Sequence, residues 1–378
     1  MIEKTYQICS RCVMDTTDPD IVFDEKGYCN HCTNAIELLK QPPYGLTLEE
    51  KEKALSRLLE KIKKDGKGRR YDCVIGLSGG VDSSYVAYLV KEWGLRPLAI
   101  HMDNGWNTEE GTQNVENICK ILEIELINIV LDWENFKDLQ LAFLKASTPD
   151  SEIPTDNIIH KSLFETADKY GIKYVLSGYN MSSESILPLA WSQGHLDKRY
   201  IKAIHKHFGT QPKLKFSLSS VYHLDIYRFV KKLKIVNILD YIDYDKEKAK
   251  ETLQKKLKWQ DYGRKHGESI YTKIFQEYIL PVKFGFDKRR AHLSSLIVSG
   301  QLSRKEAIKY MDETLYANNQ TLQRDIEILC DKFEITKEDF EKIMNLQIKF
   351  IHDYPNEGKT FRYKLYSFIK NIVKRLKR

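Results

Sequence analysis

Long apolar runs are missing from this sequence of 378 residues, and none approaches the roughly 20 residues that a membrane-spanning helix needs. The first residues, MIEKTYQICSRC, contain no apolar core of a secretory signal peptide. With 42% hydrophobic and 30% charged residues, the composition is that of a globular protein of two or three domains. We therefore expect a cytoplasmic protein.

Most of the chain carries no net charge. The formal charge is +7, and the last 18 residues hold seven Lys and Arg but no Asp or Glu. This tail accounts for the whole excess, so the other 360 residues are formally neutral. A general nucleic-acid binder has a broad basic field, which this body lacks, and no nucleic-acid partner is expected.

Cysteines are few and unevenly placed. Four of the seven form two Cys-x2-Cys pairs near the start of the chain: Cys9, Cys12, Cys29 and Cys32. Two such pairs, each on a tight turn, can surround one Zn²⁺ with four thiolates. An iron–sulfur cluster is the alternative. A site without an open position is structural, so residues 1–45 are expected to form a small zinc-ribbon-like head with a hairpin between the pairs.

From Tyr71 onward, strand-like runs alternate with helix-like runs. The strand-like runs, with the loops that follow them, are YDCVIGL, RPLAIHMDNGW, ELINIVLD and IKYVLSGYN. Alternation with short connections predicts an α/β fold with a parallel sheet and helices on both faces. Ligands bind such sheets at the carboxyl ends of the strands, so SGGVDSS, HMDNGWN and SGYNMSSES are the candidate binding loops.

The strand signal fades beyond about Tyr241. Stretches such as KEKAKETLQKKLKWQDY, SIYTKIFQEYILPVKF and KRRAHLSSLIVSG indicate helices instead. We therefore expect three parts: the head at 1–45, an α/β nucleotide-binding domain at 46–245, and a helical C-terminal region at 246–378 that ends in a basic amphipathic tail.

The loop SGGVDSS lacks the Gly-Lys-Ser/Thr ending of the familiar nucleotide-binding loop. Gly79 and Gly80 allow backbone N–H groups to approach an anion, and a helix beginning around Ser83 turns its positive end toward it. With no lysine to hold a transferring γ-phosphate, the pattern predicts an anion site. A tight strand-to-helix turn without a ligand is the alternative.

The same loop, after a buried strand, resembles the PP-loop of the ATP pyrophosphatases, which have the adenine nucleotide alpha-hydrolase-like fold. The resemblance implies that the loop holds the pyrophosphate part of ATP, with Mg²⁺, while a substrate oxygen attacks the α-phosphate. It implies catalytic roles for Asp82 and Ser78, although Asp82 as a helix cap is an equal alternative. The ATP-binding residues that it implies are Ser78, Gly79, Gly80, Asp82, Ser83, Ser84, Met102, Gly178 and Asn180.

The four-cysteine head, LSGGVDSSY, VLSGYNMSSES and YTKIFQEYILPVKFGFDKRRAHLSSLIVSGQLSR resemble the N-acetyl sugar amidotransferases of bacterial surface-glycan synthesis, from Cys9 to about Lys309. The resemblance implies that an acetamido group on a nucleotide-linked sugar is adenylated and that ammonia then replaces AMP, in the synthesis of lipopolysaccharide O-antigen or flagellin glycans. Ile2 replaces the cysteine of an N-terminal glutaminase, and the spare cysteines lie in apolar runs. A separate glutaminase subunit is therefore expected to supply the ammonia.

Several residues are candidates for binding the sugar nucleotide. Trp191 could stack on a sugar or base, although a buried tryptophan is at least as plausible. The basic stretch DKRRAH suits the phosphates of a sugar nucleotide, and a solvated helix face is its alternative. The full candidate set is Glu184, Trp191, Lys198, Lys288, Arg289 and Arg290.

In the tail, YKLYSFIKNIVKRLKR, an apolar stripe that includes Val373 and Leu376 runs among Lys and Arg residues. Such a helix can lie on an anionic membrane, or pack on the protein body or on a partner. For the whole chain, a tRNA-modifying PP-loop enzyme of the thiolase type is the main alternative function, and a nucleotide-binding regulatory module without catalysis is a second.

Overall fold

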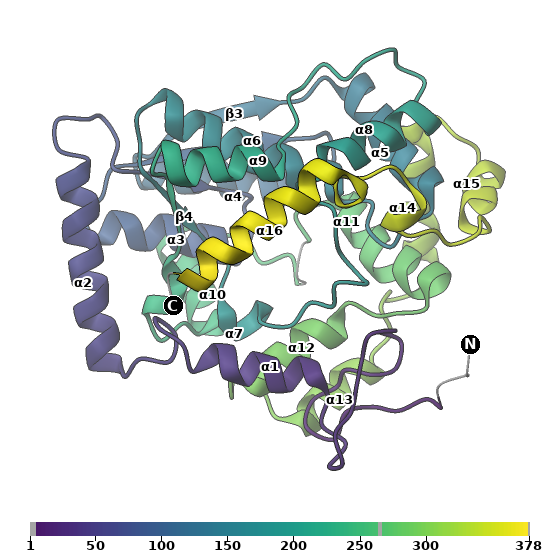
Figure 1. Ribbon diagram of the computed structural model, residues 1–378, viewed down its shortest axis with the longest axis horizontal. Helices are drawn as coiled ribbons and strands as arrows, with labels where there is room; N and C mark the ends of the chain where they lie inside the picture. The colour runs from purple at the N-terminus through teal and green to yellow at the C-terminus, as the bar shows by residue number, and fades with distance from the viewer. Residues whose placement is uncertain (1–4, 264–266, 377–378) are drawn as a thin grey trace.

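The computed structural model describes residues 5–263 and 267–376, without the side chains of residues 373–376. Ile2 and the side chains of Val373 and Leu376 therefore lie outside the described residues. A five-stranded parallel sheet in the order β3-β2-β1-β4-β5 forms the centre (Figure 1). Its strands are β1 (Cys73–Gly76), β2 (Pro97–Asp103), β3 (Glu125–Val130), β4 (Tyr174–Ser177) and β5 (Lys234–Asn237). The predicted parallel sheet is confirmed, and β5 is a strand that the sequence reading did not include.

Helices cover both faces of the sheet because each strand alternates its apolar side chains. Cys73 and Ile75 of β1 pack into one apolar cluster, and Val74 packs into another on the opposite face. The first face is covered by α2 (Leu48–Asp65), α3 (Val81–Glu92), α4 (Glu109–Ile121) and α10 (Lys246–Leu257). The second face is covered by α6 (Ile153–Lys169), α9 (Val221–Asp225) and the π-helical turn η1 (Ile226–Val230).

The strand order creates a switch point beside β1. The chain moves from β1 to β2 and β3 on one side, and then returns to place β4 on the other side of β1. The loops after β1 and β4 therefore leave the carboxyl edge of the sheet next to each other. Open α/β sheets bind their ligands at such a point.

A second layer of helices extends beyond the carboxyl edge, and the expectation of a helical C-terminal region is confirmed. Pro281 has no N–H, and the chain passes through it as a π-helical segment. The elements of this layer are α5 (Trp133–Ala146), α7 (Met181–Glu184), α8 (Lys198–Phe208), α11 (Ile270–Ile274), η3 (Phe275–Phe284), α12 (Arg289–Val298), α13 (Arg304–Asp312), α14 (Asn319–Phe333), α15 (Lys337–Met344) and α16 (Phe361–Leu376).

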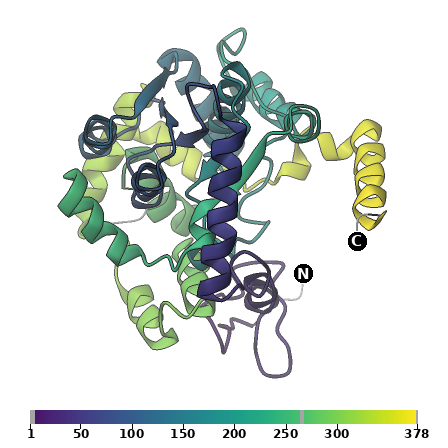
Figure 2. The same cartoon turned by 90° about the vertical axis from the view of Figure 1, so that its left-hand side faces the viewer.

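The N-terminal head lies against α12 and α13, apart from the sheet (Figures 1 and 2). Among the described residues of the head, the expected hairpin is reduced to a short turn. The antiparallel bridge Phe23–Cys29 closes it, and within it the Gly27 N–H donates to the Asp24 carbonyl at 2.9 Å, before helix α1 (Asn30–Leu39). The second cysteine pair also differs from the expected tight turn, since Cys29 is the N-cap of α1.

The expected boundary between the α/β domain and the helical region, at 245/246, stays a prediction. Helix α10 follows this boundary in sequence and packs on α3 and α4, on the first face of the sheet. None of the helices in the described ranges combines the length and the apolar character that a membrane crossing requires.

Candidate functional site

The glycine loop joins β1 to α3 at the switch point. On its other side lies the loop that follows β4, where a Cβ on Gly178 would come within 3.1 Å of the Asp82 carbonyl carbon and the Ser83 nitrogen. Residues from two strands that are far apart in the sequence therefore meet at the start of α3. This is the place that the sequence predicted for the nucleotide.

Gly79 has a φ of +88°, and a Cβ there would lie 2.4 Å from the carbonyl oxygen of Gly111. Gly80 is the N-cap of α3 and makes no side-chain cap hydrogen bond, so the first-turn N–H groups have no side-chain acceptor from the cap. The Ser78 and Ser83 hydroxyls are 3.2 Å apart beside them. This cradle of backbone amides and hydroxyls fits the pyrophosphate of ATP.

The walls of the loop come from a distant segment that the sequence reading did not single out. Trp259 Nε1 donates to the Gly79 carbonyl at 2.8 Å. A Cβ on Gly80 would lie 3.2 Å from the Tyr262 hydroxyl and 3.3 Å from Glu268 Oε1. No local pattern marks these residues, because their role arises from the return of the chain after α10.

Asp82 lies in the first turn of α3, where its carboxylate accepts a hydrogen bond from the Tyr244 hydroxyl. Burial, together with the charge of Asp82, raises the pKa of Tyr244, so this hydroxyl remains a donor. Ser84 differs from the expectation, since it is buried in the core and its hydroxyl has no partner among the described residues. It does not line the surface of the loop.

Asn180 acts as a helix cap. Its side-chain oxygen accepts from the Ser183 N–H and from the Ser182 and Ser183 hydroxyls, so it holds α7 in place. Met102 lies in β2 opposite Ile129, with its side chain half-buried. Roles for Asn180 and Met102 in nucleotide binding stay predictions, and for Asn180 the structure favours positioning over contact.

The predicted sugar-nucleotide residues are scattered. Trp191 is 1% exposed and stacks on Phe286 at 4.5 Å, so its indole has no open face for a sugar. Glu184 ends α7, and Lys198 begins α8. Lys288 lies beside the start of α6, with its Nζ 3.7 Å from a Glu152 oxygen.

Arg289 and Arg290 do not converge with Lys288. Arg289 pairs with Asp287 at 2.8 Å and donates to the carbonyls of Tyr310 and Glu313. Arg290 binds Asp15 of the head at 2.9 Å and donates to the Val13 carbonyl. Both arginines therefore bind neighbouring segments of the protein itself, and the predicted phosphate-binding cluster does not form.

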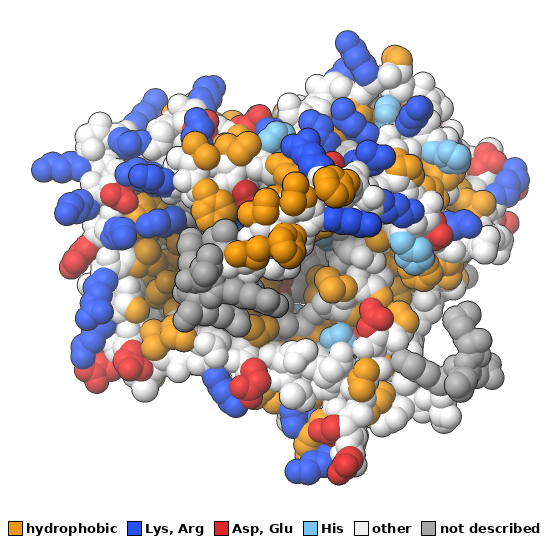
Figure 3. All heavy atoms as spheres, in the orientation of Figure 1, with side chains coloured by type: hydrophobic (Ala, Val, Ile, Leu, Met, Phe, Trp, Pro, Cys, Tyr) orange, Lys and Arg blue, Asp and Glu red, His pale blue; other side chains and the backbone are white. Residues whose placement is uncertain are grey.

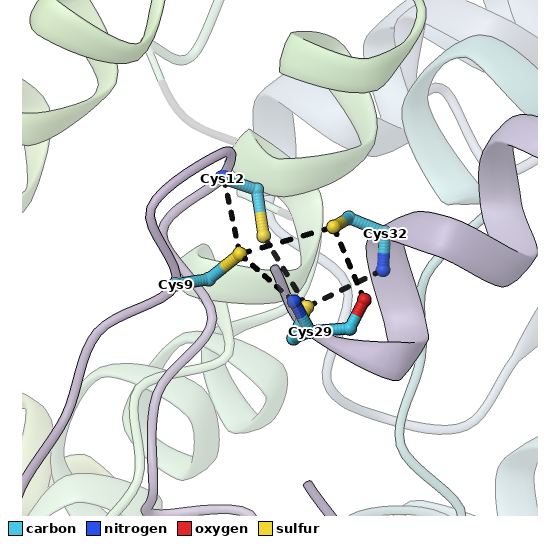
Figure 4. A group of neighbouring side chains, drawn as sticks. All are labelled: Cys9, Cys12, Cys29 and Cys32. Atoms are coloured by element: carbon cyan, nitrogen blue, oxygen red, sulfur yellow. Dashed lines mark hydrogen bonds between the residues drawn. The ribbon is translucent and has the colours of Figure 1, made fainter. Parts of the chain in front are cut away.

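The four cysteines of the head converge (Figure 4), and all four side chains are buried. Their sulfurs lie within 4.8 Å of one another, with Cys9 and Cys32 at 3.8 Å and Cys12 and Cys29 at 3.6 Å. A tetrahedral Zn²⁺ with Zn–S bonds of about 2.3 Å separates its sulfurs by roughly 3.8 Å. The donor set and the spacing therefore fit zinc.

The C-terminal helix α16 stands off from the body (Figure 2) and crosses a face that is hollowed beneath it (Figure 3). Asp225 of α9 anchors it by accepting from the Tyr366 hydroxyl and pairing with Lys370 at 3.2 Å. Five apolar side chains remain between 42% and 80% exposed: Phe361, Leu365, Phe368, Ile369 and Ile372. Figure 3 shows Lys and Arg side chains among these apolar groups.

Two parts of the chain match known protein families. Residues 268–370 match the family described as "LPS biosynthesis protein WbpG-like, C-terminal domain", and residues 51–169 match the family "NAD synthase". Among solved structures, the NH3-dependent NAD synthetase from Campylobacter jejuni aligns at 20% identity over 54% of this chain and 93% of that one, with a TM-score of 0.29. The NMN synthetase from Francisella tularensis aligns at 16% identity over 58% and 100%, also with a TM-score of 0.29.

Two curated proteins match a shorter part of the chain. An uncharacterized protein of Methanocaldococcus jannaschii, MJ1599, is 27% identical over 176 residues, which are 46% of this chain and 59% of that protein. The tRNA-specific 2-thiouridylase MnmA 2 of Fusobacterium nucleatum is 35% identical over 154 residues, or 39% and 42% of the two chains. The chain thus spans about half the length of these relatives. The chain thus combines a region that matches the NAD synthase family with a later region that matches the C-terminal domain of the WbpG-like lipopolysaccharide biosynthesis proteins.

Proposed function

We propose that the protein is an ATP-dependent amidotransferase that converts the acetamido group of a nucleotide-linked sugar into an acetamidino group, for O-antigen or flagellin glycans. One observation carries the proposal. Glu268, the first residue of the WbpG-like region, lies against the glycine loop, and a Cβ on Gly111 would lie 3.1 Å from the Glu268 Cβ. The region that resembles lipopolysaccharide biosynthesis proteins therefore supplies a wall of the candidate ATP site.

The loop suits a reaction that releases pyrophosphate. An amide oxygen is a poor leaving group, and transfer of AMP to it makes its replacement by nitrogen feasible. The amides at the start of α3, with Ser78 and Ser83, would hold the leaving pyrophosphate. Asp82 would orient the loop through Tyr244 and help to hold Mg²⁺, which neutralises the charge that develops on the phosphates.

We further propose that a separate glutaminase subunit supplies the ammonia. A glutaminase nucleophile needs an accessible thiolate. The three cysteines outside the head, Cys73, Cys119 and Cys330, are all buried. Burial raises the pKa of each of these thiols, in the case of Cys119 to about 11.

The test is the release of AMP and pyrophosphate by the purified protein with MgATP and ammonium. One series adds acetamido sugar nucleotides and another adds bulk tRNA. We expect AMP formation that depends on a sugar nucleotide, together with an amidine product that mass spectrometry detects. AMP formation that responds only to tRNA would contradict the proposal.

Thiolation of tRNA is the second candidate, because several curated relatives are tRNA-specific 2-thiouridylases. Their matches cover 29% to 39% of this chain. Sulfur transfer usually requires reactive cysteines, and the buried Cys73, Cys119 and Cys330 do not provide accessible thiolates. The tRNA series above separates the two candidates.

For α16 we propose contact with an anionic membrane surface, because exposed apolar side chains and basic residues share this helix. The protein should sediment with vesicles that contain phosphatidylglycerol and not with pure phosphatidylcholine vesicles. Phe368→Glu should lower this binding about tenfold, since it removes an apolar anchor and adds a repelled charge. Leu48→Glu, at an exposed leucine at the start of α2, is the control and should bind like the unchanged protein. Equal binding to both kinds of vesicle would contradict the proposal.

A further inference from the structure

A polar recess lies beyond the carboxyl edge of the sheet, around the first turn of α6. We name it the His195 recess, and its side chains come from three segments: Asp150, Glu152, Asp156, His195 and Lys288. His195 Nδ1 lies 3.1 Å from Asp156, and its Nε2 lies 3.4 Å from Asp150. The Ser192 hydroxyl donates to Asp150 at 2.6 Å and lies 2.7 Å from the same Nε2. The imidazole is thus bracketed by two carboxylates.

The backbone around His195 is held firmly. Asn157 of α6 donates its amide to the His195 carbonyl at 2.5 Å and to the Ser219 carbonyl at 3.1 Å, and it accepts from the Ser219 N–H at 2.7 Å. Asn157 is buried and follows Asp156 directly in the chain. The carboxylate that pairs with His195, from Asp156, and the amide that holds the His195 backbone, from Asn157, therefore come from the same turn of α6.

The recess is open to solvent, although protein surrounds its groups. The Asp156 and His195 side chains are 46% and 28% exposed. Desolvation is nevertheless the largest influence on the pKa of Asp156, of His195 and of Lys288. These side chains are therefore accessible to a small solute, and their charges still influence one another.

Contacts at the carboxyl edge of the sheet connect the recess with the segment beside the glycine loop and with the loop after β2. Glu268 lies against Gly80 and Gly111, and three residues later the Tyr271 hydroxyl lies 2.6 Å from that of Ser151. Three residues of extended chain span at most about 11 Å. Asn104, in the loop after β2, donates to Thr155 at 3.3 Å, and Thr155 precedes Asp156. The glycine loop and the recess therefore lie at the same edge of the sheet.

His195 has the protonation chemistry of a base that works near neutral pH. Desolvation by itself would lower the pKa of His195, but the hydrogen bond and charge of Asp156 and the charge of Asp150 outweigh it and raise the pKa to about 8. Lys288 opposes this rise, and His160 of α6 also faces the group, with a pKa that burial lowers. The neutral form is therefore a minor but accessible species at pH 7, roughly a tenth of the total.

We propose that His195, held by Asp156 and Asp150, is the proton acceptor that converts ammonium into the attacking ammonia. The inference rests on the amidotransferase function proposed above and adds a second subsite to it. The ligand class is a small cation, ammonium, which the carboxylates of the recess attract. Nε2 of His195, which faces the Ser192 hydroxyl and Asp150, is the nitrogen that would take its proton.

The chemistry balances without a further reactant. Ammonium gives one proton to neutral His195 and becomes ammonia, and the two aspartates stabilise the imidazolium that forms. The ammonia nitrogen then bonds to the carbon of the adenylated imidate. The C–O bond breaks, and its electron pair leaves with AMP. The amidinium product keeps all three ammonia hydrogens, and the imidazolium later returns its proton to water.

The test compares His195→Gln with the unchanged protein in two half-reactions and with two nucleophiles. With ammonium at pH 7, amidine formation should fall about 100-fold, which is typical for removal of a general base. With hydroxylamine, which is unprotonated at this pH, turnover should change only a few-fold. Exchange of pyrophosphate into ATP, which reports the adenylation step, should also stay within a few-fold. Above pH 8 the deficit with ammonium should shrink, because free ammonia becomes abundant.

His205→Gln is the matched control, because His205 also pairs with an aspartate, Asp138 at 3.1 Å, in a buried setting away from the recess. It should keep both nucleophile activities, and thermal unfolding of both variants reports any loss of folding. Undiminished turnover of His195→Gln with ammonium would overturn the inference and leave the proposed function intact. Equal losses with both nucleophiles would also overturn it, since they indicate a structural role. If the unchanged protein forms no AMP with any acetamido sugar nucleotide, the proposed function fails, and the inference fails with it.

Discussion

Gly79→Ala is expected to weaken MgATP binding about 100-fold or more. The φ of +88° at Gly79 strains any residue with a Cβ, by about 1–2 kcal/mol. The added methyl group would also lie 2.4 Å from the Gly111 carbonyl oxygen, which belongs to backbone that cannot rotate away. The loop would have to move, and the Trp259 hydrogen bond to the Gly79 carbonyl would be lost with it. Isothermal titration calorimetry measures the effect without any knowledge of the acceptor substrate.

Gly68→Ala separates backbone strain from steric conflict. Gly68 has a φ of +78°, close to that of Gly79, but nothing lies within 4 Å of the position that its Cβ would take. It should therefore share the strain and keep the affinity for MgATP. Unchanged affinity in Gly79→Ala, or equal losses in the two variants, would show that the loop does not hold the nucleotide as the geometry suggests.

Cys29→Ser is expected to remove the metal from the N-terminal head and to unfold the head. Cys29 has two roles, since it is one of the four converging sulfurs and also the N-cap of α1, where it accepts from the Cys32 N–H. Serine is a good N-cap but a poor zinc ligand, so the substitution keeps the cap and removes only the metal bond. Metal analysis should find about one zinc in the unchanged protein and almost none in the variant.

Loss of the metal should spread to the contact between head and body. Arg304 donates to the Cys9 carbonyl at 3.0 Å and to the Cys12 carbonyl at 3.0 Å, and Arg290 pairs with Asp15. These anchors need the folded head, so limited proteolysis should cut within it in the variant. Cys330→Ser, at a buried cysteine of α14, should lose some stability and keep the zinc. Full zinc in Cys29→Ser, or an iron cluster with visible absorption, would contradict the assignment.

The local sequence was sufficient to predict those features that are built by residues close together in the chain. A buried strand followed by Gly79, Gly80 and a helix start is sufficient to predict an anion site, because the backbone amides that form it belong to the same few residues. The two Cys-x2-Cys pairs predicted the four-sulfur cluster in the same way. Alternating strands and helices predicted the parallel sheet, since a helix between two strands returns the chain to the edge where the first strand began.

Tertiary structure alone decided what surrounds these parts. Trp259 and Glu268 reach the loop from well over 100 residues away in the chain, and no local pattern marks them. The basic stretch around Lys288 was expected to bind phosphates as a unit, but packing directs Arg290 to the head and only Lys288 toward the recess. His195 lies in an unremarkable turn, and its chemistry comes from carboxylates that α6 and the preceding loop place beside it. Contacts between distant segments form only after the chain has folded, so the local sequence determined the glycine loop and the four-cysteine cluster, and the fold decided which side chains surround them.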